Sequence, residues 1–184
     1  KKVFADKEKC HAFLDRSLKD KKPFKVPEKL SSSIQEITTG EYRMEVAYIP
    51  AAEGMNQVVL YIHGGAYVNQ ITKRHWSMLG KVARGSGAAL YVPNYPLAPT
   101  HTWKEGYALM DALYRQLLKE YKADDIIFMG DSAGGGFALA FAGYLNAASL
   151  PQPGKIIVFS PWLDLSMENP EIPDYEASDP MLSA

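Results

Sequence analysis

Residues 126–136 read IIFMGDSAGGG, in which a short apolar run leads directly to a serine flanked by glycine and alanine. An apolar run of this length is typical of a strand that is buried on both faces of a sheet. The five residues Gly130–Gly134 match the pattern G-x-S-x-G, and an alanine-rich helical segment follows at 133–148. Small residues on either side of Ser132 allow a sharp turn from strand to helix. The stretch therefore predicts a tight turn that lifts the Ser132 hydroxyl above the sheet edge as a candidate nucleophile.

Ser132 has two interpretations on this motif alone. A serine before a helix is a common N-cap, whose hydroxyl accepts a hydrogen bond from a backbone N–H of the first turn. A nucleophile would instead face outward, next to a helix N-terminus whose N–H groups favour developing negative charge. The motif by itself does not separate a structural serine from a catalytic one.

A glycine-rich loop after an earlier apolar run favours the catalytic interpretation. The segment VVLYIH (58–63) leads into HGGAY (63–67). HGG loops occur in lipases and esterases, where their backbone N–H groups form an oxyanion hole. A loop with few side chains can turn these N–H groups toward a substrate carbonyl, and Ala133, directly after Ser132, would add another. The two motifs together predict acyl transfer by a serine.

The remaining pattern alternates strands with helices. The apolar runs suit buried parallel strands and the segments between them have helical spacing, so we expect an α/β fold with a mostly parallel sheet. Gly40 lies between two alternating segments, which predicts an antiparallel hairpin. The expected strands are 33–39, 41–49, 58–63, 88–95, 126–131 and 155–162, and the expected helices are 3–19, 74–84, 103–122 and 133–148.

The composition is that of one globular domain of 184 residues, with 47% hydrophobic and 22% charged residues. A formal net charge of −1 gives no reason to expect nucleic acid or an anionic membrane as a partner. No apolar run approaches the roughly 20 residues that span a bilayer. No histidine or cysteine cluster has ligand spacing, so we expect neither a metal nor a cofactor. The only cysteine, Cys10, fits a reducing compartment, and we expect it buried in a cytoplasmic protein.

Five segments in order resemble the hormone-sensitive-lipase-like branch of the α/β-hydrolase superfamily. They are YIHGGAY (61–67), YPLAP (95–99), GDSAGGG (130–136), SPWLDLS (160–166) and DPML (179–182). The resemblance covers roughly residues 33–184. It implies an α/β-hydrolase fold and a serine carboxylester hydrolase that cleaves small or medium acyl esters through an acyl-enzyme.

The resemblance also implies roles for single residues. Ser132 would be the nucleophile. The family usually has a third glycine where this chain has Ala66, a mild departure that leaves the N–H available. The oxyanion hole would be formed by Gly64, Gly65, Ala66 and Ala133, and the motifs would be supported by His63, Gly130, Asp131 and Gly134.

The base that would activate the serine is missing from its usual place. In α/β-hydrolases the chain order is Ser, then Asp or Glu, then His. No histidine follows Ser132 here; the four are His11, His63, His75 and His101. We expect His63 in the oxyanion loop, His101 in a structural role, and His11 and His75 on helix surfaces. By the resemblance, Asp164 and Asp179 hold loops and neither is the triad acid.

We therefore expect an incomplete chain that is nearly inactive alone. Residues 1–30 would be an N-terminal helix and linker contributing to a cap, 31–164 the N-terminal portion of the hydrolase core, and 165–184 the start of a cap segment. The missing part could bind as a separate chain, and an uncovered sheet edge could pair in a homo-oligomer. The alternatives are an inactive ligand-binding protein on the same scaffold and an amidase or deacetylase of the same fold.

Overall fold

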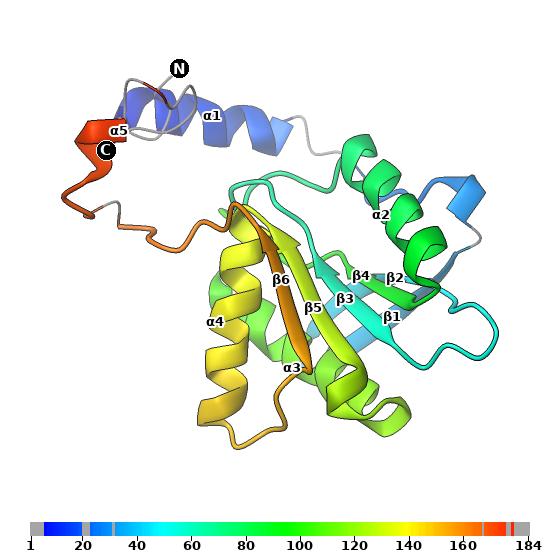
Figure 1. The fold of residues 1–184 in the computed structure, drawn as a ribbon. Helices are drawn as coiled ribbons and strands as arrows, with labels where there is room; N and C mark the ends of the chain where they lie inside the picture. Colours follow the sequence, from blue (N-terminus) through cyan, green and yellow to red (C-terminus); the bar gives the residue numbers. More distant parts are fainter. Residues whose placement is uncertain (1–5, 20–22, 31, 167, 176–177, 179–184) are drawn as a thin grey trace.

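The apolar runs form one six-stranded sheet in the computed structural model, which describes residues 6–19, 23–30, 32–166, 168–175 and 178 (Figure 1). The spatial order of the strands is β1-β2-β4-β3-β5-β6. β1 and β2 form the predicted antiparallel hairpin, β2 pairs antiparallel with β4, and the remaining pairs are parallel. The strands are β1 (Ser33–Thr39), β2 (Tyr42–Ile49), β3 (Val58–Ile62), β4 (Ala89–Pro93), β5 (Ile126–Asp131) and β6 (Lys155–Phe159).

Helices cover both faces of this sheet, with α3 and α4 on one side and α2 on the other (Figure 1). Two short 3₁₀ turns, at Glu28–Leu30 and Ala123–Asp125, join the elements. Within the described part of the chain, no helix has the length and apolarity needed to cross a bilayer. The helices are α1 (Lys7–Lys19), α2 (Lys73–Ser86), α3 (Trp103–Glu120), α4 (Ala133–Ala147) and α5 (Ile172–Tyr175).

The central strands are apolar on both faces because each face contributes to a separate core. In β3, Leu60 and Ile62 belong to the core under α3 and α4, whereas Val59 and Tyr61 belong to the core under α2. Every residue of β3 and β4 is buried, and so are the first five of β5. These strands confirm the expected parallel α/β architecture.

The strand β6 differs from the prediction of a run buried on both faces. It ends at Phe159 and, among the residues that the structure describes, pairs only with β5. Its residues alternate between exposed and partly buried, with Ile157 41% and Phe159 46% exposed. Apolar content alone does not show whether both faces of a strand are covered, because coverage depends on the helices that pack on each face. Here α4 contacts one face of β6, and the core under α2 contains no residue of this strand.

The first helix was expected to bury the side chain of Cys10. α1 contains no buried residue, and Cys10 is partly exposed, so the prediction of a buried thiol is wrong. In Figure 1, α1 lies beyond the ends of the central strands, apart from the layers of α2, α3 and α4. The assignment of residues 1–30 and 165–184 to a cap stays a prediction.

Candidate active site

The turn between β5 and α4 presents Ser132 at the surface in an unusual backbone conformation. Ser132 has φ 50° and ψ −122°, it is exposed, and its side chain makes no capping hydrogen bond to α4. Positive φ is costly for a residue other than glycine and persists only when the surroundings impose it. The Ser132 N–H donates to the Phe159 carbonyl at 2.9 Å, and its carbonyl accepts from the N–H of Trp162 at 2.9 Å. The lack of a capping hydrogen bond from the Ser132 side chain argues against its interpretation as a structural N-cap.

The glycines around the serine are required by close backbone contacts. A Cβ atom on Gly134 would lie 2.1 Å from the Ile62 carbonyl oxygen and 2.6 Å from that of His63. A Cβ atom on Gly130 would lie 2.5 Å from the Gly134 carbonyl oxygen. The start of α4 therefore packs against the end of β3, where the HGG loop begins, and only a residue without a side chain fits at this position.

The carbonyl groups of His63, Gly64 and Gly65 in the HGG loop accept hydrogen bonds from the protein. The Tyr95 hydroxyl donates to the His63 carbonyl at 2.7 Å, and the His63 Nδ1 lies 2.8 Å from the Gly64 carbonyl. The Gly65 carbonyl accepts from the N–H groups of Val68 at 3.0 Å and Asn69 at 2.8 Å. A peptide is planar and trans, so the C=O of one residue and the N–H of the next point in opposite directions. A hydrogen bond that fixes the carbonyl therefore also fixes the direction of the following N–H.

Several backbone N–H groups of the two motifs have no acceptor among the described residues. They include those of Gly65, Ala66 and Ala133. Two consecutive residues of the loop have positive φ values, 143° at Gly65 and 54° at Ala66. Consecutive N–H groups in such a turn can form a concave site for an anion.

Gly64 does not fit the predicted set of oxyanion donors. Its N–H donates to Asp131 Oδ1 at 2.9 Å and is therefore not free for a substrate. A Cβ atom on Gly64 would lie 2.3 Å from Asp131 Oδ2, so this glycine allows the carboxylate to approach the loop. The sequence could not reveal this contact, because it depends on the pairing of β3 with β5.

Asp131 is an ionised carboxylate beneath the loop. Burial raises its pKa, but hydrogen bonds from His75, the Tyr61 hydroxyl and the Gly64 N–H outweigh burial and lower the pKa to about 2. The pKa of Tyr61, whose hydroxyl donates to Asp131, is shifted upward: burial raises it most, and the contact with Asp131 raises it further. Asp131 therefore remains charged and Tyr61 remains a donor throughout the neutral range.

His63 is a fully buried, neutral histidine. Burial lowers its pKa to about 4. Its Nδ1 faces the Gly64 carbonyl, which can only accept, so Nδ1 carries the proton. Its ring packs against Tyr95, with the ring centroids 4.6 Å apart. Lacking any exposed surface, His63 can orient the loop but cannot contact a substrate.

The structure corrects the predicted surface position of His75. Only 19% of its side chain is exposed, and its Nε2 lies 3.3 Å from Asp131 Oδ2. Its Nδ1 accepts from the Thr72 N–H at 2.9 Å, as part of a capping box at the start of α2. From the sequence, His75 is only the third residue of a helix, and nothing there indicates a contact with Asp131.

Two of the aspartates after the serine, Asp164 and Asp174, lie among the described residues. Asp164 accepts from the N–H groups of Ser166 and Glu168, both at 3.0 Å, which confirms its predicted role in holding a loop. Hydrogen bonds, chiefly from the Ser166 hydroxyl, keep the pKa of Asp164 below its usual value. Asp174 is exposed in α5. Asp179 lies outside the described residues.

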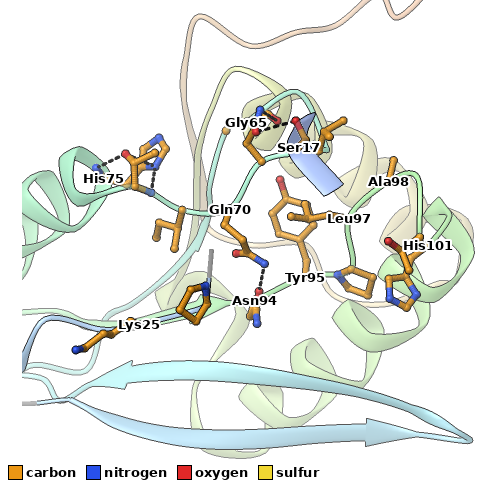
Figure 2. A pocket seen from close by; sticks show the side chains of 18 of the residues that line it. Ser17, Lys25, Gly65, Gln70, His75, Asn94, Tyr95, Leu97, Ala98 and His101 are labelled. Carbon is orange, nitrogen blue, oxygen red and sulfur yellow. Dashed lines mark hydrogen bonds between the residues drawn. The ribbon is translucent and has the colours of Figure 1, made fainter. Parts of the chain in front are cut away.

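A cavity of about 1610 Å³ lies between α1, the HGG loop and the segment after β4 (Figure 2). Gly65 and His75 contribute to its lining, whereas Ser132 does not. Ser17 of α1 donates to Asn69 Oδ1 at 3.2 Å, and Asn69 in turn donates to the Gly65 carbonyl. The cavity is therefore lined by the HGG loop but not by Ser132.

Among the described residues, no group of three or more histidine, cysteine, aspartate or glutamate side chains could hold a metal ion. The chemistry available at this site is that of an exposed hydroxyl, open backbone N–H groups and a nearby carboxylate.

This combination of sheet, serine turn and glycine loop defines a fold family. Residues 59–184 match the model of a family described as alpha/beta hydrolase fold, and the chain belongs to this family. The predicted resemblance to its hormone-sensitive-lipase-like branch is confirmed by the relatives.

Two curated relatives and one solved structure illustrate the match. A triacylglycerol lipase of Mycobacterium tuberculosis is 33% identical over 123 residues, which are 66% of this chain and 28% of that protein. An esterase of Acinetobacter venetianus is 31% identical over 136 residues, 73% of this chain and 45% of that protein. An esterase from the bacterial hormone-sensitive lipase family has a TM-score of 0.70 at 27% identity, covering 100% of this chain and 59% of that one. The chain thus spans less than half of both curated relatives.

Proposed function

We propose that the protein is a serine carboxylester hydrolase in which Ser132 is the nucleophile. The observation that carries the proposal is an exposed, strained Ser132 beside a loop in which the carbonyls of His63, Gly64 and Gly65 accept hydrogen bonds. The N–H groups of Gly65 and Ala66 in this loop have no acceptor among the described residues. Relatives named as esterase and triacylglycerol lipase support the same reaction class.

In the proposed reaction, the Ser132 Oγ attacks the ester carbonyl carbon and forms a tetrahedral intermediate. The N–H groups of Gly65, Ala66 and Ala133 would stabilise the resulting oxyanion. Loss of one donor of this kind typically costs about 2.7–4 kcal/mol of transition-state stabilisation. A general base would take the Ser132 proton and pass it to the departing alcohol. Water, deprotonated by the same base, would then hydrolyse the acyl-enzyme and release the acid.

The general base is not among the two histidines of the supporting network. His63 has no exposed surface, and both ring nitrogens of His75 are engaged, by Thr72 and Asp131. In the family order of Ser, then Asp or Glu, then His, the proposed base is a histidine that follows Ser132. None of the four histidines at positions 1–184 does so. The proposed substrates are small to medium acyl esters.

The test compares the product of the whole gene with its Ser132→Ala variant on p-nitrophenyl acetate and butyrate. We expect the variant to lose at least about three orders of magnitude in kcat, because a triad without its nucleophile retains only binding and oxyanion stabilisation. Equal rates in the two proteins would contradict the proposal. Binding of an ester without turnover by either protein would instead favour a ligand-binding protein on the hydrolase scaffold.

A further inference from the structure

One carboxylate joins the nucleophile turn, the oxyanion loop and helix α2. Asp131 directly precedes Ser132, and its Oδ1 accepts from the Tyr61 hydroxyl of β3 and from the Gly64 N–H of the loop. Its Oδ2 faces His75 Nε2 of α2 at 3.3 Å. Three elements that are separate in the sequence therefore meet at one half-buried side chain.

The protonation of His75 follows from its neighbours. Nδ1 accepts a hydrogen bond from the backbone N–H of Thr72, so Nδ1 carries no proton. Nε2 therefore carries the proton and donates to Asp131. His75 thus joins the capping box of α2 to the carboxylate, and the helix holds the donor in place.

The contact determines the orientation of the first peptide of the loop. The Gly64 N–H is fixed by Asp131 while the Gly64 carbonyl is fixed by His63. Both ends of Gly64 are therefore held, and the next N–H, that of Gly65, has its direction set by the planar peptide. A displacement of the carboxylate would move Gly64 and, with it, a proposed oxyanion donor.

We propose that Asp131 and His75 are positioning residues of the reaction: His75 holds the Asp131 carboxylate against the Gly64 N–H, so that the following N–H groups face the oxyanion. The inference rests on the proposed function. It assigns a purpose to a histidine that contacts neither the nucleophile nor a substrate in the proposed reaction, and it explains why the loop needs glycine at position 64.

The experiment compares His75→Glu with His75→Gln in the whole protein. Glutamate and glutamine are both good third residues of a capping box with Thr72, so the start of α2 is preserved in each. Glutamine also retains an N–H donor for Asp131, whereas glutamate places a second carboxylate beside it. The two variants differ only in whether the side chain ends in an amide or a carboxylate. Comparing them tests the hydrogen bond to Asp131 while the capping box is kept.

We expect His75→Glu to lower kcat by at least about tenfold with KM within about twofold, because the lost interaction acts on the transition state. We expect His75→Gln to lose less than about threefold, and both variants to melt within a few degrees of the parent protein. Equal kcat values in the two variants would overturn the proposal. Parallel losses of kcat and melting temperature in both would also overturn it, since they indicate a structural role.

Tyr61→Phe provides a second test if His75→Glu does not fold. It removes one donor to Asp131 and leaves the capping box intact. A fall in kcat of several fold without a change in KM or melting temperature supports the proposal, and an unchanged kcat overturns it. Ser132→Ala, measured alongside, separates the two claims, because full activity of that variant contradicts the proposed function whatever the result at His75.

Discussion

The serine turn after β5 and the HGG loop after β3 lie side by side at the C-terminal ends of neighbouring parallel strands. They are nevertheless held in place in different ways. The turn is held by backbone contacts that leave no room for side chains, as at Gly130 and Gly134. The loop is held by side chains from distant parts of the chain, such as Tyr95 and Asp131. The turn therefore tolerates almost no substitution at its glycines, whereas the loop depends on partners that can be altered one at a time.

The difference follows from the parallel pairing of the two strands. Ile62 of β3 is in register with Gly130 of β5, so both chains leave the sheet at the same level. After β5 the chain must reverse direction immediately to enter α4, so the backbone atoms of the turn lie in close contact. The loop does not form a helix until α2 begins at Lys73, and its peptides need external hydrogen bonds to stay fixed.

The largest expected effect is that of Gly134→Ala, which tests the crowded turn. The added Cβ would lie 2.1 Å from a backbone carbonyl oxygen of β3, which cannot move without shifting the sheet. We expect a loss of about 3 kcal/mol or more in the free energy of unfolding, at the upper end of the effects of overpacking. Chemical denaturation measures this quantity.

Gly143→Ala is the matched control on the same helix. A Cβ atom at Gly143 meets nothing within 4 Å. Alanine is a better helix former than glycine, so we expect this variant to gain about 0.5–1 kcal/mol. Opposite signs at the two positions support the account of the turn. Similar effects at both would mean that Gly134 is present for helix propensity alone.

A smaller effect is expected for the loop, through the pH dependence of stability. The pKa of buried His63 is lowered to about 4, while an unfolded histidine titrates near 6.5. Between these values the unfolded chain binds more protons than the folded one, so stability rises with pH and falls as the pH drops from about 6.5 to 4. The slope approaches about 1.4 kcal/mol per pH unit within this window.

His63→Asn isolates the contribution of this side chain. The asparagine amide can donate to the Gly64 carbonyl in place of Nδ1, but it does not titrate. We expect the slope of unfolding free energy against pH, between pH 6.5 and 4, to be smaller in the variant by up to about 1.4 kcal/mol per pH unit. The comparison concerns slopes, because the smaller side chain also leaves a cavity. Identical slopes would mean that His63 is not held neutral in the fold.

Sequence patterns predicted the parts of this architecture that depend on small residues and apolar periodicity. The strands β3, β4 and β5, the hairpin of β1 and β2, and α2, α3 and α4 were expected within a few residues of their observed bounds. The proposed roles of Ser132 and of the loop N–H groups stay predictions, and the geometry at both is compatible with them.

The parts that sequence patterns did not predict depend on tertiary contacts. In the sequence, His75 looks like an ordinary helical residue, and Tyr61 and Tyr95 look like core aromatics. Their polar contacts join elements that are distant in the chain, so the sequence does not reveal them. Gly64 was expected among the oxyanion donors because a glycine motif does not reveal which N–H groups are already engaged.

A crystal structure of the whole protein after reaction with a phosphonate ester inhibitor tests the central claim most directly. Such an inhibitor leaves a tetrahedral phosphorus on the nucleophile, with one oxygen at the position of the oxyanion. We predict a covalent bond to the Ser132 Oγ and one phosphonyl oxygen about 2.7–3.1 Å from the backbone nitrogens of Gly65, Ala66 and Ala133. An unmodified Ser132, or an adduct whose oxygens all point away from these nitrogens, would contradict the account.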